Sequence, residues 1–377
     1  MSDWSYFATN LNGDGTETFL AGQLPLSNVS ITDALSSPDS MTFDIRPEDQ
    51  RLKLPTGVVF EPWRTAIYAE KDGLIRHGSI VRGLQSKFDV LTIDTIGFSG
   101  FLNEQPWTSA PRLLYQVDPA DVVRTIWAEY QGKPAGNIGV VVSPGVKTGV
   151  KIGVRAPAST GGTTTATTTQ EDAPVVLAPY STHDLGRFMG ELLEAGSIDY
   201  REVHTRRADG TIAHDLVLAH PRMGRRRNDI RFVIGTNASV PDVDIDASDY
   251  ASEVLLLGAG EAEKMIRGHA AVPNPPRLRR VSVKLAKHIG RQETANTAAT
   301  NRAKAMVLST VDVDELTVYD HPNAPLFSWS PGDEVRLVGE TGWAGRIDMW
   351  VRIQGTTYSP DANTGSATLS VVRADKV

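Results

Sequence analysis

Five arginines placed close together offer the clearest chemistry in this sequence. They fall on the segment 222–231, as Arg222, Arg225, Arg226, Arg227 and Arg231. Guanidinium groups bind phosphate through paired hydrogen bonds, and they form well-directed ion pairs with carboxylates. Four of the five fall within six residues, which suits a compact turn better than a groove that follows a nucleic-acid backbone. We therefore favour ion pairs between strands or between subunits over contact with phosphate.

An acidic cluster lies close in sequence to these arginines, in the segment 239–250. It contains four aspartates, Asp242, Asp244, Asp246 and Asp249. Opposite charges concentrated on two neighbouring segments are most simply explained by mutual ion pairing. We take the five arginines and these four aspartates as candidate interface residues. The sequence leaves open whether they pair within one chain or between chains.

Histidine and cysteine, the usual metal ligands and nucleophiles, show no useful pattern. The densest histidine group is His204, His214 and His220, and its spacings place no two side chains on one helical turn. The chain has no cysteine, which excludes disulfides, thiolate metal sites and cysteine nucleophiles. We expect no metal site and no cofactor.

Paired acids give no better case for catalysis. Glu191 with Glu194, and Asp199 with Glu202, could be posed as glycosidase carboxylates, but a chain with 45 acidic residues offers many such pairs. We interpret them as solvated surface. An HExxH helix, a Walker loop and a Gly-x-Ser-x-Gly elbow are all missing from the sequence. We therefore expect no catalytic residue.

One loop resembles a calcium site at its start. Asn10, Asn12, Asp14 and Gly15 match the opening of an EF-hand loop. The twelfth position should be a bidentate glutamate and is Ala21. The Asn-Gly and Asp-Gly pairs in the same loop are strong hairpin signals, and we favour the hairpin.

A second loop resembles a dinucleotide-binding turn. An apolar run precedes Gly258 and Gly260, but Glu263 stands where the third glycine is needed. Its charge would repel a pyrophosphate, and no alternation of strands and helices surrounds it. We predict a β-hairpin that turns at these glycines.

The elements around the arginines are mostly strands. The arginine segment itself reads as strand, turn and strand, with apolar runs at 216–218 and 230–234 and with Pro221 and Gly224 in the turn. Further strands are predicted before residue 115 and after residue 278, where apolar and polar residues alternate between short turns.

Three helices are predicted among these strands. Residues 118–132 have Asp118 as N-cap, a proline at the next position and a closing glycine. Residues 181–196 form an amphipathic helix for which we expect Ser181 as the cap. Residues 293–308 are rich in alanine. The fold class is therefore mainly β with an α+β insert.

We predict three domains from this pattern. Residues 1–116 form a β-barrel-like domain, and residues 273–377 form a second one that carries one helix. Residues 117–272 form an α+β insert. Within the insert, the low-complexity stretch 156–174 has no apolar periodicity, and we read it as a long exposed loop.

Composition argues against general nucleic-acid binding and against membrane insertion. The net charge of -7 argues against general affinity for nucleic acid. No apolar run approaches the roughly 18 residues that span a bilayer, and the start shows no signal-peptide pattern. We expect a soluble protein that does not insert into a membrane.

Several stretches resemble one family, the minor tail proteins of the tail-tip hub of long-tailed, non-contractile phages, especially those of actinobacteria. The resemblance is carried by DYRE at 199–202, HDLVLAHPRMGRRRNDIRFVIGTN at 214–237, ASEVLLLGAGEAEKMIRG at 251–268, the helix DPADVVRTIWAEYQGKPAGNIGV at 118–140, and SPGDEVRLVG at 330–339. It covers residues 117–377 well and the first hundred residues more loosely.

This resemblance implies a structural role. Such hub proteins are related to the baseplate hub of contractile-tailed phages. They form homotrimers in which each chain contributes two tail-tube-like β-barrels, so that three chains continue a six-fold tube as a pseudo-six-fold ring. The implied partners are distal tail or tube proteins, the C-terminus of the tape-measure protein, and other minor tail and receptor-binding proteins. The implied location is the virion tail tip, assembled in the host cytoplasm, with DNA passing through the lumen.

Two other functions stay open at this point. The chain could be a cell-wall hydrolase of the tail, which release of soluble fragments from peptidoglycan would reveal. It could also be a receptor-binding or carbohydrate-binding module, whose usual mark is an exposed aromatic cluster. The seven tryptophans are spread along the chain instead.

Overall fold

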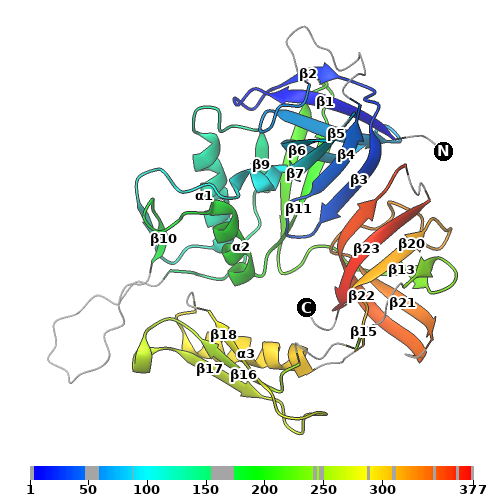
Figure 1. The fold of residues 1–377 in the computed structure, drawn as a ribbon. Helices are drawn as coiled ribbons and strands as arrows, with labels where there is room; N and C mark the ends of the chain where they lie inside the picture. The colour runs from blue at the N-terminus through cyan, green and yellow to red at the C-terminus, as the bar shows by residue number, and fades with distance from the viewer. Residues whose placement is uncertain are drawn as a thin grey trace.

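The computed structural model describes residues 4–46, 59–87, 89–153, 174–240, 244–245, 250–286, 289–307, 311–342, 345–361 and 365–374. Figure 1 shows a mainly β molecule in which strands from both ends of the chain lie together, with helices to one side. The predicted class, mainly β with α and β elements in the middle, is confirmed. None of the described helices is long and apolar enough to cross a membrane.

The largest sheet contains thirteen strands and joins the two ends of the chain. From the N-terminal part it takes β1 Ser5–Leu11, β2 Glu17–Ala21, β3 Ser27–Ala34, β4 Ser40–Ile45, β5 Thr65–Lys71, β6 Leu74–Lys87 and β7 Val90–Gly97. From the later part it takes β13 Arg226–Val233, β14 Ala238–Ser239, β20 Glu315–Tyr319, β21 Glu334–Thr341, β22 Gly345–Tyr358 and β23 Ser366–Arg373.

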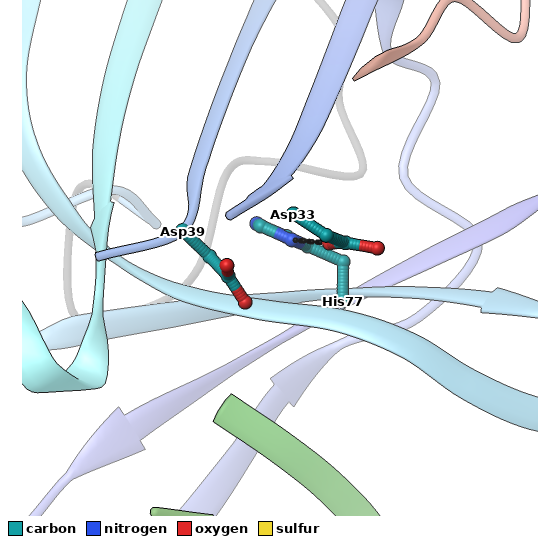
Figure 2. Close-up of side chains that lie close together, drawn as sticks. All are labelled: Asp33, Asp39 and His77. Atoms are coloured by element: carbon teal, nitrogen blue, oxygen red, sulfur yellow. Dashed lines mark hydrogen bonds and ion pairs between the residues drawn. The ribbon is translucent and has the colours of Figure 1, made fainter. Parts of the chain in front are cut away.

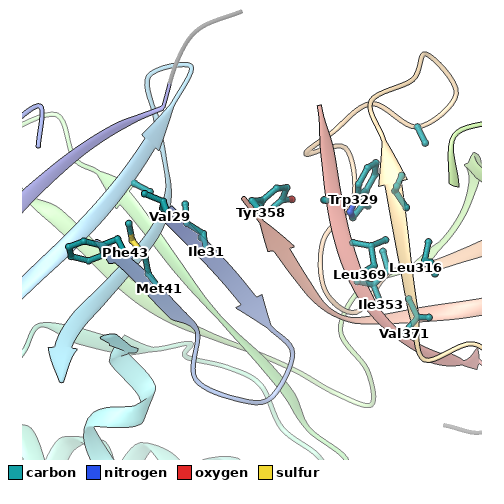
Figure 3. Packing of buried hydrophobic residues seen from close by; sticks show 14 of the residues in the cluster. Val29, Ile31, Met41, Phe43, Leu316, Trp329, Ile353, Tyr358, Leu369 and Val371 are labelled. Carbon is teal, nitrogen blue, oxygen red and sulfur yellow. The ribbon is translucent and has the colours of Figure 1, made fainter. Parts of the chain in front are cut away.

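The long strand β22 makes this sheet continuous. Its first part pairs with β21, and its last residues, 355–358, pair antiparallel with residues 31–34 of β3. One apolar core spans the joint, with Ile31 and Phe43 from one end of the chain and Leu369 from the other. Figure 3 shows the two sets of buried side chains, with Tyr358 between them.

A second core forms under two helices in the middle of the chain. The helices are α1 Pro119–Gln131 and α2 Leu185–Gly196, which pack on each other and on the short 3-10 helix η2 Phe98–Leu102. The short strands β8 Arg112–Leu114 and β10 Val175–Leu177 pair beside them, and β9 Val140–Val142 joins the hairpin of β11 Asp199–Arg206 and β12 Ile212–Ala219. The buried side chains of α1 that belong to this core include Val123, Ile126 and Trp127.

The caps of these helices confirm one prediction and correct another. Asp118 caps α1 as predicted, since its side chain accepts a hydrogen bond from the amide of Ala120 at 3.0 Å. The cap of α2 is Asp184, whose side chain accepts from the amide of Arg187, and not Ser181. The amide of Ser181 donates to the carbonyl of Ala178 instead, so the chain still turns there before the helix begins.

A small third unit lies apart from the main sheet, at the bottom of Figure 1. It consists of β16 Glu253–Leu257, β17 Arg267–Ala271, β18 Val281–Leu285 and α3 Gln292–Val307, and it has its own core. Strand β18 and helix α3 follow the predicted boundary at residue 273, whereas strands β16 and β17 precede it. Two further elements complete the described part, the 3-10 helix η3 Ala262–Lys264 and the pair β15 Asp244–Ile245 with β19 Val311–Asp312.

Both loops that resembled ligand sites are hairpins, as predicted. β1 pairs antiparallel with β2, and β16 pairs antiparallel with β17. The loop 156–174 lies outside the described residues apart from its last position. Strand pairing among the described residues closes no sheet into a barrel. The two barrels and the boundaries of the three domains therefore stay predictions.

Candidate assembly interface

The arginine segment is a crossover between two sheets. The two strands predicted on either side of the turn exist as β12 and β13, but they do not pair with each other. β12 pairs with β11 and β9, whereas β13 pairs in parallel with β21 of the main sheet. Ile230 and Phe232 of β13 face the large core, which fixes the strand on the C-terminal side of the molecule.

Glu334, at the start of β21, receives two of the arginines. The guanidinium of Arg226 lies 2.8 Å from its carboxylate, and that of Arg222 lies 3.5 Å away. The Arg226 guanidinium also stacks over the ring of Trp350, 4.6 Å from the ring centroid, where a cation is attracted by the aromatic face. Through these contacts the crossover packs against strands β21 and β22.

Arg227 is the buried member of the group. Its guanidinium pairs with Asp229 at 2.7 Å and with Asp333 at 3.2 Å, and it donates to the carbonyl of Ser328 at 2.5 Å. The hydrogen bonds from Arg227 lower the pKa of Asp229 to about 2, because they favour the ionised carboxylate. Arg227 therefore fixes β13 to the loop before β21.

A glycine contact brings the backbones together at the same place. Gly224 has a φ of +81°, and a Cβ added there would lie 2.2 Å from the carbonyl carbon of Gly332. Gly332 itself has a φ of +102°. Both positions need glycine, because the left-handed backbone and the close approach leave no room for a side chain.

A buried ion pair ties this crossover to the middle of the chain. Asp199, the first residue of β11, pairs with Arg352 of β22 and accepts a hydrogen bond from the amide of Met223 at 2.7 Å. The reading of Asp199 and Glu202 as solvated surface is wrong. Glu202 is buried and accepts from the amides of Phe98 and Ser99 at 2.6 and 3.1 Å. Strand alternation could not reveal this, because the covering elements come from distant parts of the chain.

Arg225 and Arg231 differ from the other three. Both are exposed, and within the described residues neither side chain forms an ion pair. The backbone amide of Arg225 donates to Asp333 at 3.0 Å, so its position is fixed while its guanidinium stays open to another molecule. For these two residues the interface role stays a prediction.

The four aspartates cannot be placed against the arginines. Asp242, Asp246 and Asp249 lie outside the described residues, and Asp244 is described only as a backbone position of β15. Among the described residues, the acids that contact the arginines are Asp229, Asp333 and Glu334 of the same chain, none of which was predicted as a partner. The nearest signal was the position of Asp229 two residues after Arg227. The other two become visible only once β13 is paired with β21.

The chain resembles known proteins in fold and not in sequence. No protein-family model matches the sequence, and no curated protein matches it significantly. The 43 kDa tail protein of prophage MuSo2 from Shewanella oneidensis superposes with a TM-score of 0.58 over 99% of both chains, at 12% identity. The tail protein from Neisseria meningitidis MC58 superposes with a TM-score of 0.55 over 99% of this chain and 97% of that chain, at 15% identity.

A third similar structure is part of a complex from Francisella. All of this chain superposes on 59% of a chain in the half-lidded PdpA–VgrG complex of Francisella, with a TM-score of 0.53 and 9% identity. The chain thus has the fold of phage tail proteins, a fold also found in that complex. The first two similar structures are tail proteins, which agrees with the prediction that this chain is not an enzyme.

Proposed function

We propose that this chain is a structural tail protein that forms a homotrimeric hub at the tip of a phage-type tail. The observation that carries the proposal is the shared fold with the Shewanella prophage tail protein over 99% of both chains. Agreement of the fold over nearly the whole of both chains favours the same kind of building block.

In this role three chains form a ring with pseudo-six-fold symmetry. The ring joins the tail tube to the tip proteins, holds the C-terminus of the tape-measure protein and lets DNA pass. The net charge of -7 suits a channel that repels DNA and lets it slide. Assembly is the whole mechanism, and no covalent bond is made or broken.

An exposed apolar surface supports assembly with other chains. Val281, Val283 and Leu285 lie on one face of β18 and are 46%, 59% and 65% exposed. Leu255 and Leu257 of β16 lie directly beside Val283 and Leu285 in the parallel register. Among the described strands β18 pairs with β16 alone. An exposed apolar strand at a sheet edge invites association, and we assign this face, the β18 face, to a second copy of the chain.

Mass measurement tests the trimer. One chain has a mass of 40.8 kDa, and light scattering of the purified protein is expected to give three times that value. A mass of one chain at every concentration up to those used for structural work would contradict the trimer while leaving the tail fold intact.

A further inference from the structure

A buried cluster of charged residues lies away from the arginine segment. Asp33 is at the end of β3, Asp39 precedes β4, and His77 lies in β6. One possible ligand atom from each lies within 4.8 Å of the other two. Figure 2 shows the imidazole of His77 with one edge against Asp33 and its far end turned toward Asp39.

The imidazole of His77 is held as metal-binding imidazoles are held. The residue is 1% exposed, and its Nδ1 lies 3.1 Å from a carboxylate oxygen of Asp33. With Nδ1 donating its proton to Asp33, the Nε2 atom carries the free lone pair. Nε2 is buried and has no hydrogen-bond partner among the described residues. A carboxylate that orients one ring nitrogen while the other binds an ion is the usual arrangement at metal sites.

Asp39 supplies a second carboxylate to the cluster, and it forms no direct ion pair with another described residue. It is 4% exposed, and one of its oxygens accepts from the amide of Ala34 at 2.7 Å. Its backbone amide donates to the buried carboxylate of Glu202 at 3.4 Å, so the acids Asp33, Asp39 and Glu202 lie close together here. Three acids converging in a low dielectric require added positive charge, which a proton or a metal ion can supply.

The two arginines nearby do not fill this position. Arg76 and Arg201 line the same cavity as Asp33 and Asp39, but the described residues include no ion pair between these arginines and the two aspartates. The guanidinium of Arg76 lies over the ring of Phe327, 4.8 Å from its centroid. The cavity of about 210 Å³ has room for waters that would complete the coordination of an ion.

We propose that Asp39 and His77 bind one divalent transition-metal ion, with Asp33 orienting the imidazole and water from the cavity filling the remaining positions. Carboxylate and water oxygens with a single imidazole match the preferences of Mn²⁺ or a similar ion. The ion would tie β6 to the turn between β3 and β4, beside the point where β3 meets β22. No sequence motif marks this site, because Asp33, Asp39 and His77 follow no known spacing of metal ligands.

Titration of the chelator-treated full chain with Mn²⁺ tests the proposal. Electron paramagnetic resonance follows the free ion, whose six-line signal weakens on binding. We expect about one ion per chain and a higher unfolding temperature with the ion than without it. Asp39→Asn and His77→Gln are expected to weaken binding at least tenfold, and Asp33→Asn by a factor of about 10 to 100.

His269→Gln is the matched control. His269 is exposed and lies 2.8 Å from Glu253, so it represents an adventitious surface pair, and its loss should leave the Mn²⁺ affinity unchanged. Far-ultraviolet circular dichroism checks that each variant is folded, and Asp33→Asn, at a half-buried position, serves if the two buried variants do not fold. Absence of binding to the wild-type chain, or equal binding by the folded site variants, would overturn the proposal and leave protons as the compensating charge.

Discussion

At the scale of residues, Arg227 and Arg225 differ, because Arg227 is buried in ion pairs and Arg225 is exposed. Arg227→Met removes a guanidinium with two carboxylate partners and leaves Asp333 buried without its cation. We expect a loss of about 2–4 kcal/mol in the free energy of unfolding. Arg225→Met is the control, and because the side chain of Arg225 is exposed it should change stability by less than about 0.5 kcal/mol. Equal losses in urea denaturation would show that Arg227 has no special role.

The pairing of Arg227 also predicts how stability depends on pH. The pKa of Asp229 is about 2 in the folded chain, below the roughly 3.9 of an unfolded aspartate. This contribution is therefore present above about pH 4 and is lost as the pH falls toward 2. We expect the difference in urea midpoint between the wild type and Asp229→Asn to shrink over this range. A difference that stays constant between pH 5 and pH 2 would count against the pair.

At the scale of elements, the contact between the crossover and the loop before β21 rests on Gly224. Gly224→Ala places a methyl group against the backbone of Gly332 and also strains a positive φ. Gly210→Ala is the control, since Gly210 has a φ of +86° but nothing within 4 Å of an added Cβ. We expect the control to lose about 1 kcal/mol from backbone strain and Gly224→Ala to lose about 1–3 kcal/mol more. Equal losses in urea denaturation would show that the close contact relaxes freely.

Local signals predicted the elements well, and long-range pairing is where they failed. Asp118 and its following proline marked the start of α1, because capping is decided within one turn of the chain. Apolar and polar residues alternate over 230–232 of β13, but its partner β21 lies about a hundred residues later, and alternation fixes only which face is buried. The acids that meet the arginines and the burial of Glu202 depend on such pairings, so no spacing along the chain could reveal them.

At the scale of the whole molecule, the β18 face is the surface that the trimer proposal needs. Val283→Glu puts a charge in the middle of this exposed apolar row and is expected to shift the mass by light scattering from three chains toward one. Leu74→Glu is the control, because Leu74 is similarly exposed but lies alone at the turn between β5 and β6. A trimer that survives Val283→Glu would place the interface elsewhere on the chain.

A second feature of the whole molecule is the continuous sheet that β22 forms by pairing with β3. The sequence indicated β structure at both ends, and the structure shows that these ends share one sheet and one core. Backbone hydrogen bonds between β22 and β3 therefore connect the N-terminal and C-terminal strands directly.

Image reconstruction of the tail that contains this chain tests the central claim most directly. For the proposed homotrimeric hub we expect a ring of three copies at the tail tip, with the main sheet around the channel and the β18 face buried between neighbouring copies. A chain that is absent from purified particles, or present as a single copy outside the tail axis, would contradict it.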